Sequence, residues 1–168
     1  MSAPRWRLIS GFVTDPDGLF RVIRDAVTWT GQMRARDTAS LGIPYNYAGA
    51  SYPEAPWPEA VAVLRDRVGE ALGFTPTNAL ITHYPTGDHS IGWHADDVSI
   101  LSPGSPIAIV SLGGPRTLRL RSGTDPDFEY TMEKSIIQNE KINYGHVNNK
   151  GFLVKILLQD GAPVLTLE

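Results

Sequence analysis

The sequence lacks cysteine altogether. This absence excludes disulfide scaffolds and cysteine-ligated zinc sites, so any bound metal must be held by histidine and carboxylate side chains. Histidine is also scarce, because only His83, His89, His94 and His146 occur among the 168 residues. A metal site would have to be built from this short set.

Two further absences restrict location and partners. The sequence shows neither a basic, apolar signal segment at its N-terminus nor a run of about 18 apolar residues, which a membrane-spanning helix needs. We therefore expect a cytoplasmic protein that does not interact with a membrane. We also expect a monomer. The net charge of −3 argues against nonspecific coating of nucleic acid, although a local basic groove is compatible with it.

The composition that is present indicates a globular chain with many turns. Hydrophobic residues make up 42% of the sequence and charged residues 20%, and 168 residues suit one domain. The 16 glycines and 13 prolines favour short strands over a helical bundle. We expect a single domain over residues 1–168, with helices and a substrate lid in 1–75 and a β core in 76–168.

Hydrophobic spacing predicts two helices followed by a run of strands. Helical periodicity indicates one helix over 15–30 and a second over 57–72, closed by Gly73. Residues 31–53 between them are loop-like. Strands are expected near 78–84, 90–95, 106–112, 116–121, 127–132, 135–138 and 151–158. This order predicts an α+β fold whose helices back one sheet.

The basic residues are sorted along the chain. All 11 arginines lie at or before Arg121, and all 4 lysines lie at or after Lys134. Residues 134–168 are therefore atypical in composition. Either they form a surface hairpin with its own composition, or they have a different origin through insertion, fusion or construction.

The triplet His94-Ala95-Asp96 is the first candidate metal motif. On a strand, residues two apart point to the same face, so this imidazole and this carboxylate would converge on one ion. Two histidines and one carboxylate hold iron(II) on one side and leave the remaining positions open. The triplet alone is also compatible with a hydrogen-bonded structural histidine.

Three segments carry a family resemblance. IPYNYAGASYP, TNALITHYPTGDHSIGWHADD and IAIVSLGGPRTLRLR resemble, in order and spacing, motifs of the AlkB-like Fe(II)/2-oxoglutarate-dependent dioxygenase family. The resemblance runs from Trp6 to Tyr130. It implies a double-stranded β-helix (jelly roll), with Fe(II) and 2-oxoglutarate bound inside the barrel by His94, Asp96 and neighbouring groups. The implied activity is oxidative demethylation of alkylated nucleic acid bases in DNA or RNA repair.

The resemblance also asks for a third ligand on a later strand. His146 has the required spacing, and the strand after it is then expected to run antiparallel through the barrel and to direct Lys155 inward. Alternatively, His146 lies in an exposed loop. The segment LLQDGAPVLTLE itself resembles the strand that precedes the family's distal histidine, in which case the ligand strand is absent.

The cosubstrate site departs from the family pattern. Tyr84 matches a tyrosine that hydrogen-bonds 2-oxoglutarate, and Thr82 stands where the family has asparagine. The distal carboxylate needs a fixed cation, for which arginine is best suited. No arginine follows Arg121. Lys155 is the nearest equivalent, although it is equally compatible with an edge strand that faces water.

The substrate side is predicted from the same resemblance. Tyr45 and Tyr47 belong to a lid whose aromatic rings suit a single-stranded or flipped base. Trp93 and Arg116 complete the expected substrate contacts. Alternatively, the tyrosines pack in the core and the arginines are solvated.

Further candidates and functions remain open. Arg34 and Arg36 are additional candidates for phosphate contacts, and His83 and His89 are expected at the surface rather than at a metal. A hydroxylase of a protein or small molecule and a catalytically inactive β-helix binding module are the alternative functions. The missing arginine strand favours the inactive module.

Overall fold

The computed structural model describes the molecule over most of its first 114 residues and over separate strands thereafter. The described residues are 5–30, 36–44, 46, 51–86, 89, 91–94, 96, 101–102, 107–114, 116–120, 128–132, 135–140, 153–159 and 164–167. From residue 116 onward it describes the backbone and the side chain of Leu118. Within these ranges, neither helix has the length and apolar content that crossing a membrane would require.

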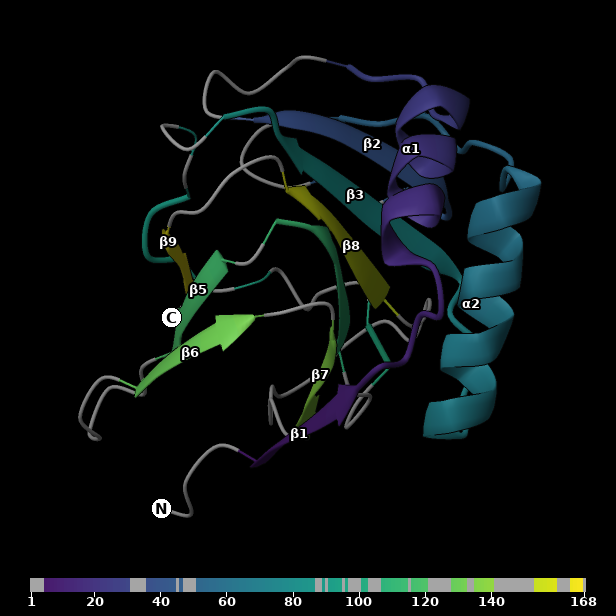
Figure 1. Ribbon diagram of the computed structural model, residues 1–168. Coiled ribbons are helices and arrows are strands. Elements are labelled where there is room, and N and C mark those ends of the chain that lie inside the picture. Colours follow the sequence, from purple (N-terminus) through teal and green to yellow (C-terminus); the bar gives the residue numbers. More distant parts are fainter. Residues whose placement is uncertain are drawn as a thin grey trace.

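Two sheets and two helices make up the described fold. The helices are α1 (Pro16–Ala26) and α2 (Glu59–Leu72). The larger sheet contains β1 (Arg5–Ser10), β2 (Asp37–Gly42), β3 (Asn78–Tyr84), β4 (Ile107–Gly113), β7 (Ser135–Glu140) and β8 (Leu153–Gln159), in the order β1-β7-β4-β8-β3-β2. The smaller sheet contains β5 (Arg116–Leu120), β6 (Phe128–Met132) and β9 (Val164–Leu167), in the order β6-β5-β9. Figure 1 shows both sheets with the helices at one side.

Both helices begin and end where local chemistry allows. Asp15 caps α1, since its Oδ1 accepts a hydrogen bond from the Gly18 amide at 2.9 Å, and Pro16 occupies the first turn, where no amide donor is needed. α2 ends at Gly73, whose φ of 74° is a left-handed conformation that glycine adopts without steric cost. The two predicted helices are therefore confirmed, with α1 ending at Ala26.

The helices pack on one face of the six-stranded sheet. Alternate residues of its central strands join apolar residues of α1 and α2 in a single buried cluster. The sheet contributes Ala39, Leu41, Ala79, Ile81, Ala108, Val110 and Leu112, and the helices contribute Phe20, Ile23, Val61, Leu64 and Val68. The expectation that helices back one sheet is confirmed.

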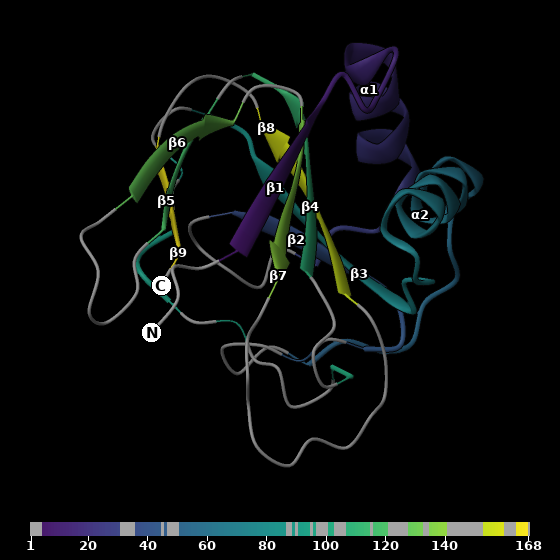
Figure 2. The ribbon, with the colours of Figure 1, turned by 90° about the horizontal axis from the view of Figure 1, so that it is seen from below.

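The other face of this sheet looks toward the three-stranded sheet (Figure 2). Since side chains alternate along a strand, the residues between those of the helix-facing cluster occupy this second face. We call it the inner face. Its buried members on β2, β3 and β4 are Thr38, Ser40, Asn78, Leu80, Thr82, Tyr84, Ile107, Ile109 and Ser111.

Several strands differ from the sequence expectations. β1, β2 and β9 were not predicted, and β2 lies within the segment 31–53 that was expected to be loop-like. The strand expected near 90–95 is wrong for the described residues 91–94, where Trp93 lies at a bend and Ile91 forms a single bridge. Gly92 has no side chain to favour extended backbone there.

The direction of β8 also differs from expectation. β8 pairs in parallel with both β3 and β4, whereas the strand after His146 was expected to be antiparallel. β4 has an antiparallel neighbour in β7 and a parallel neighbour in β8. The last residues of β7 and the first residues of β8 therefore both lie beside the first residues of β4.

Candidate metal and cosubstrate site

His94 and Asp96 lie close together in a mostly buried position. The Nε2 atom of His94 is 3.6 Å from Oδ1 of Asp96, and the two side chains are 13% and 10% exposed. Two atoms that each bind a metal at about 2.0–2.2 Å can be at most about 4.4 Å apart, so this separation fits a shared ion. They converge although the described residues 91–94 form no strand.

The hydrogen bond of His94 selects the ring nitrogen that can bind a metal. Its Nδ1 lies 2.9 Å from the carbonyl oxygen of Gly92. A carbonyl only accepts hydrogen bonds, so Nδ1 donates and Nε2 carries the lone pair in the neutral ring. Metal-binding histidines are commonly oriented by such a bond to the backbone. This donor set of one imidazole and one carboxylate fits iron(II).

A third ligand is not found within the described ranges. No group of three or more His, Asp or Glu side chains able to hold a metal occurs there. His146, the predicted third ligand, lies outside the described residues. The site therefore consists of two placed ligands and one that stays a prediction.

The predicted cosubstrate residues on β3 lie on the inner face. Thr82 and Tyr84 are buried, and His83 between them faces the helices. Residue 155 of β8 is paired with Leu80, and Tyr84 is paired with Gln159. The side chain of Lys155 lies outside the description, so its role in binding 2-oxoglutarate stays a prediction.

Most of the predicted substrate contacts are not described. Tyr45 and Tyr47 lie outside the described residues, and of Arg116 only the backbone, paired with Met132, is described. Trp93 is partly buried beside His94. The lid prediction for these tyrosines stays open.

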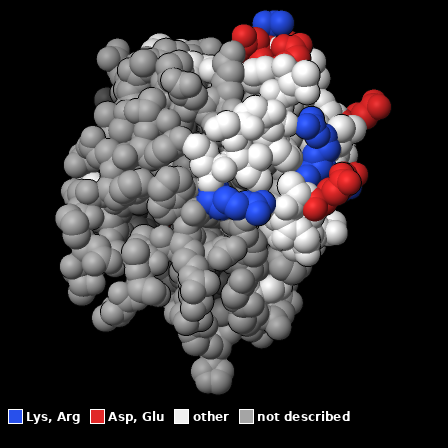
Figure 3. Space-filling view, turned by 60° about the horizontal axis from the view of Figure 1, so that its bottom comes forward, with Lys and Arg blue, Asp and Glu red and all other residues white. Residues whose placement is uncertain are grey.

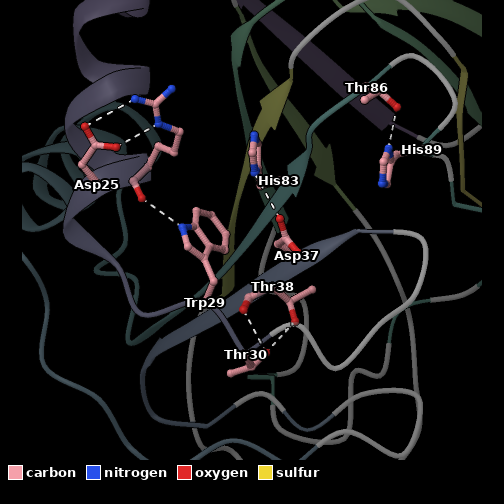
Figure 4. Close-up of polar contacts among 9 residues, drawn as sticks. Asp25, Trp29, Thr30, Asp37, Thr38, His83, Thr86 and His89 are labelled. Carbon is pink, nitrogen blue, oxygen red and sulfur yellow. Dashed lines mark hydrogen bonds and ion pairs between the residues drawn. The ribbon is translucent and has the colours of Figure 1, made fainter.

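The last tyrosine of the segment IPYNYAGASYP, Tyr52, belongs to the core. Tyr52 is buried, and its hydroxyl lies 2.9 Å from Oγ1 of Thr38 on β2. Thr38 is also 3.1 Å from the hydroxyl of Thr30, which closes a hydroxyl network along the edge of the sheet (Figure 4). For Tyr52, the alternative that the tyrosines pack in the core is therefore confirmed.

Arg36 is placed differently from either sequence expectation. It is 8% exposed, so it is neither a solvated arginine nor a surface contact for phosphate, and Arg34 lies outside the described residues. The alternation of polar and apolar residues in DTASLG could have revealed β2, and with it the burial of the arginine directly before it.

His83 corrects the expectation of a surface histidine. It is buried on the helix-facing side of β3, with Nδ1 3.4 Å from Oδ2 of Asp37. Its ring centroid lies 5.5 Å from that of Trp29 and 6.0 Å from that of Phe20, because α1 and the residues after it cover this strand position (Figure 4). His89 is partly buried, and its Nδ1 lies 2.7 Å from Oγ1 of Thr86.

Charges of both signs are interspersed on the described part of the face in Figure 3. Several are paired with neighbours, as in Arg65 with Asp66 at 2.7 Å. On α1, the hydrogen bond from Arg24 lowers the pKa of the exposed Asp25 carboxyl. Within the described surface of that view, basic side chains do not gather into a patch of one sign.

Comparison with known proteins places these observations in a family. Residues 21–145 match the 2OG-Fe(II) oxygenase superfamily. The chain is 40% identical over 94 residues to the DNA oxidative demethylase ALKBH2 of Mus musculus, which covers 55% of this chain and 39% of that protein. It is 29% identical over 126 residues to the alpha-ketoglutarate-dependent dioxygenase alkB homolog 3 of Homo sapiens, covering 74% of this chain and 42% of that protein.

The matched part thus spans about two-fifths of each relative's length, 39% and 42%. The names of both relatives confirm the resemblance to AlkB-like oxygenases. Fe(II) and 2-oxoglutarate are the metal and the cosubstrate after which the matched family is named. Since that match covers most of the chain and includes both placed metal ligands, the chain belongs to the 2OG-Fe(II) oxygenase superfamily.

Proposed function

We propose that this protein is a 2-oxoglutarate-dependent dioxygenase that oxidatively demethylates alkylated bases of nucleic acid. The observation that carries the proposal is the convergence of His94 Nε2 and Asp96 Oδ1 at 3.6 Å in a chain of this superfamily. The relative in Mus musculus is named a DNA oxidative demethylase, which supports this substrate class.

The site's own residues would bind and orient the reactants. When bound, Fe(II) with 2-oxoglutarate and oxygen supplies the oxidising power to hydroxylate a C–H bond. His94 and Asp96 hold the metal, and His146 is the proposed third ligand. We infer that the six-stranded and three-stranded sheets are the two layers of a double-stranded β-helix, which would exclude water from the reacting atoms.

The cosubstrate would lie against the inner face. The hydroxyls of Thr82 and Tyr84 are the proposed hydrogen-bonding groups for 2-oxoglutarate, and both residues are buried there. A cation must balance the distal carboxylate in this buried setting. Lys155 is the cation that the sequence suggests for this role.

The substrate base would be held at the lid. Tyr45, Tyr47 and Trp93 are proposed to contact a single-stranded or flipped base, and Arg116 a phosphate. Hydroxylation of an N-methyl group would give a hydroxymethyl product that decomposes to formaldehyde and the repaired base. Replacing Tyr45 and Tyr47 by alanine should therefore lower both oligonucleotide affinity and demethylation.

One assay tests the proposal directly. The full chain is incubated with Fe(II), 2-oxoglutarate and an oligonucleotide that carries a methylated base, and succinate and formaldehyde are quantified. Equal amounts of both products, dependent on the methyl group, are expected. Succinate without formaldehyde, released in the presence of a protein or small molecule, would favour the hydroxylase alternative.

A binding module without turnover is the second candidate. The parallel direction of β8 and the lysine-rich composition of residues 134–168 favour it. In that case, the protein would bind 2-oxoglutarate and release no succinate under any of these conditions. Replacing His146 by alanine would then leave Mn(II) affinity unchanged.

A further inference from the structure

Arg36 is a buried cation whose charge is not balanced by any described neighbour. It is 8% exposed, and none of the residues that the structure describes forms a hydrogen bond or ion pair with its guanidinium. Removing a charged group from water without a partner is costly, and buried charges in proteins are paired as a rule. An anion that binds at this position would remove that cost.

The position of Arg36 points to the inner face. β2 and β3 pair antiparallel with Asp37 opposite His83 and Thr38 opposite Thr82. Asp37 lies on the helix-facing side, because it contacts His83 there. By strand alternation, Arg36 shares the inner face with Thr38, and one further step of the same register sets it beside Tyr84.

We propose that Arg36 binds the distal carboxylate of 2-oxoglutarate together with Tyr84. The proposal rests on the cosubstrate named above and assigns it a cation that comes from the strand before the lid. A guanidinium presents two parallel N–H groups that match a carboxylate, and it remains charged when buried. The phenol of Tyr84, itself buried, supplies a third donor at the same end of the sheet.

The pairing of β3 with β8 places Lys155 far from Tyr84 along the strand. Residue 155 pairs with Leu80, whereas Tyr84 pairs with Gln159, four residues further along β8. At about 3.3 Å per residue, this offset is about 13 Å along the strand. An extended lysine side chain is shorter than that, so Arg36 is the cation next to the carboxylate that Tyr84 contacts.

The depth of Arg36 distinguishes a carboxylate from a phosphate of nucleic acid. A polymer phosphate keeps its chain on both sides and binds at the surface, whereas a free dicarboxylate can enter a closed site. Arg36 is nine-tenths buried, and Tyr84 beside it is 2% exposed. This burial favours the small ligand.

A binding experiment with two keto acids tests the proposal. The full chain is loaded with Mn(II), and the dissociation constants of 2-oxoglutarate and of 2-oxobutyrate, which lacks the distal carboxylate, are measured by calorimetry. Arg36→Met is expected to weaken the binding of 2-oxoglutarate roughly 10- to 100-fold, the loss for a hydrogen-bonded charged group. The affinity for 2-oxobutyrate should not change. Arg21→Met, an exposed arginine of α1, is the matched control with no expected effect.

The other outcomes overturn the proposal in distinguishable ways. Unchanged affinity of Arg36→Met for 2-oxoglutarate removes Arg36 from the site and leaves the proposed function standing. Equal weakening of both keto acids, or loss of oligonucleotide affinity alone, excludes a specific contact with the distal carboxylate. Absence of 2-oxoglutarate binding in the wild type sinks both proposals. If Arg36→Met fails to fold, Arg36→Lys must still weaken the binding of 2-oxoglutarate and not that of 2-oxobutyrate. Lysine keeps the positive charge and lacks the two parallel N–H groups of the guanidinium.

Discussion

The two faces of the six-stranded sheet are both buried but differ in chemistry. On the helix-facing side, Ala79 and Ile81 of β3 pack in an apolar cluster with α1 and α2. On the inner face, the same strand presents Asn78, Thr82 and Tyr84. A buried polar group lowers stability unless it is hydrogen-bonded, and among the described residues the side-chain amide of Asn78 is buried without a hydrogen-bond partner.

This contrast separates stability from function along a single strand. Neighbouring residues of β3 point to opposite faces, so a change at one position should affect folding and a change at the next should affect binding. The helix-facing cluster supplies the free energy of folding. We propose that the polar residues of the inner face bind ligands, as expected where function and stability compete.

Ile81→Ala and Thr82→Val should show the largest difference between the two faces. Ile81 is fully buried in the helix-facing cluster, so its truncation should lower the free energy of unfolding by about 2–5 kcal/mol. Thr82→Val keeps the shape of the side chain and removes one hydroxyl. It should leave the free energy of unfolding nearly unchanged and weaken the binding of 2-oxoglutarate. Urea unfolding and calorimetry measure the two effects. A large loss of stability in Thr82→Val would show that both faces serve packing.

Asn78→Leu tests whether the inner face lowers stability. Asn78 is fully buried, and within the described residues neither Nδ2 nor Oδ1 has a hydrogen-bond partner. Leucine of similar size should therefore raise the free energy of unfolding by about 1–3 kcal/mol, the cost of an unsatisfied buried polar group. Asn78→Asp is the matched control and should destabilise the protein. A destabilised leucine variant would contradict the proposed cost.

A smaller effect is expected for Tyr52→Phe. This change removes the hydroxyl that lies 2.9 Å from Thr38, and should lower the free energy of unfolding by about 0.5–1.5 kcal/mol. Because Tyr52 is buried, oligonucleotide affinity should not change. Reduced oligonucleotide affinity without a loss of stability would contradict the core assignment and show that Tyr52 belongs to the substrate lid.

The two helices and the His94–Asp96 motif could be predicted from the sequence, because local periodicity and motif spacing determine them. Both helices follow from their apolar repeats and from Asp15 and Gly73 at their ends. The family resemblance located His94 and Asp96, and the match over residues 21–145 confirms the family. The 3.6 Å approach of these two side chains arises at a bend rather than on the expected strand.

Long-range pairing was not predictable in the same way. Residues 31–53 were expected to be loop-like because aromatic and glycine residues are interleaved there, and β2 within this segment is a strand that pairs with β3 about 40 residues later. The burial of His83 depends on α1 and Trp29, which cover its position from a distant part of the sequence. The pattern of residues 151–158 predicted a strand there, whereas the parallel direction of β8 depends on its pairing with β3 and β4.

Metal titration of the wild type and of Asp96→Ala tests the central claim most directly. Mn(II) is added to the full chain in a calorimeter, with Asp66→Ala, an exposed carboxylate on α2, as the control. We predict that the wild type and the control bind one ion with the same affinity. Asp96→Ala should bind none, because His94 and the proposed ligand His146 are neutral imidazoles and the variant lacks the one negatively charged ligand. Unchanged Mn(II) affinity in Asp96→Ala would contradict the assignment of this site.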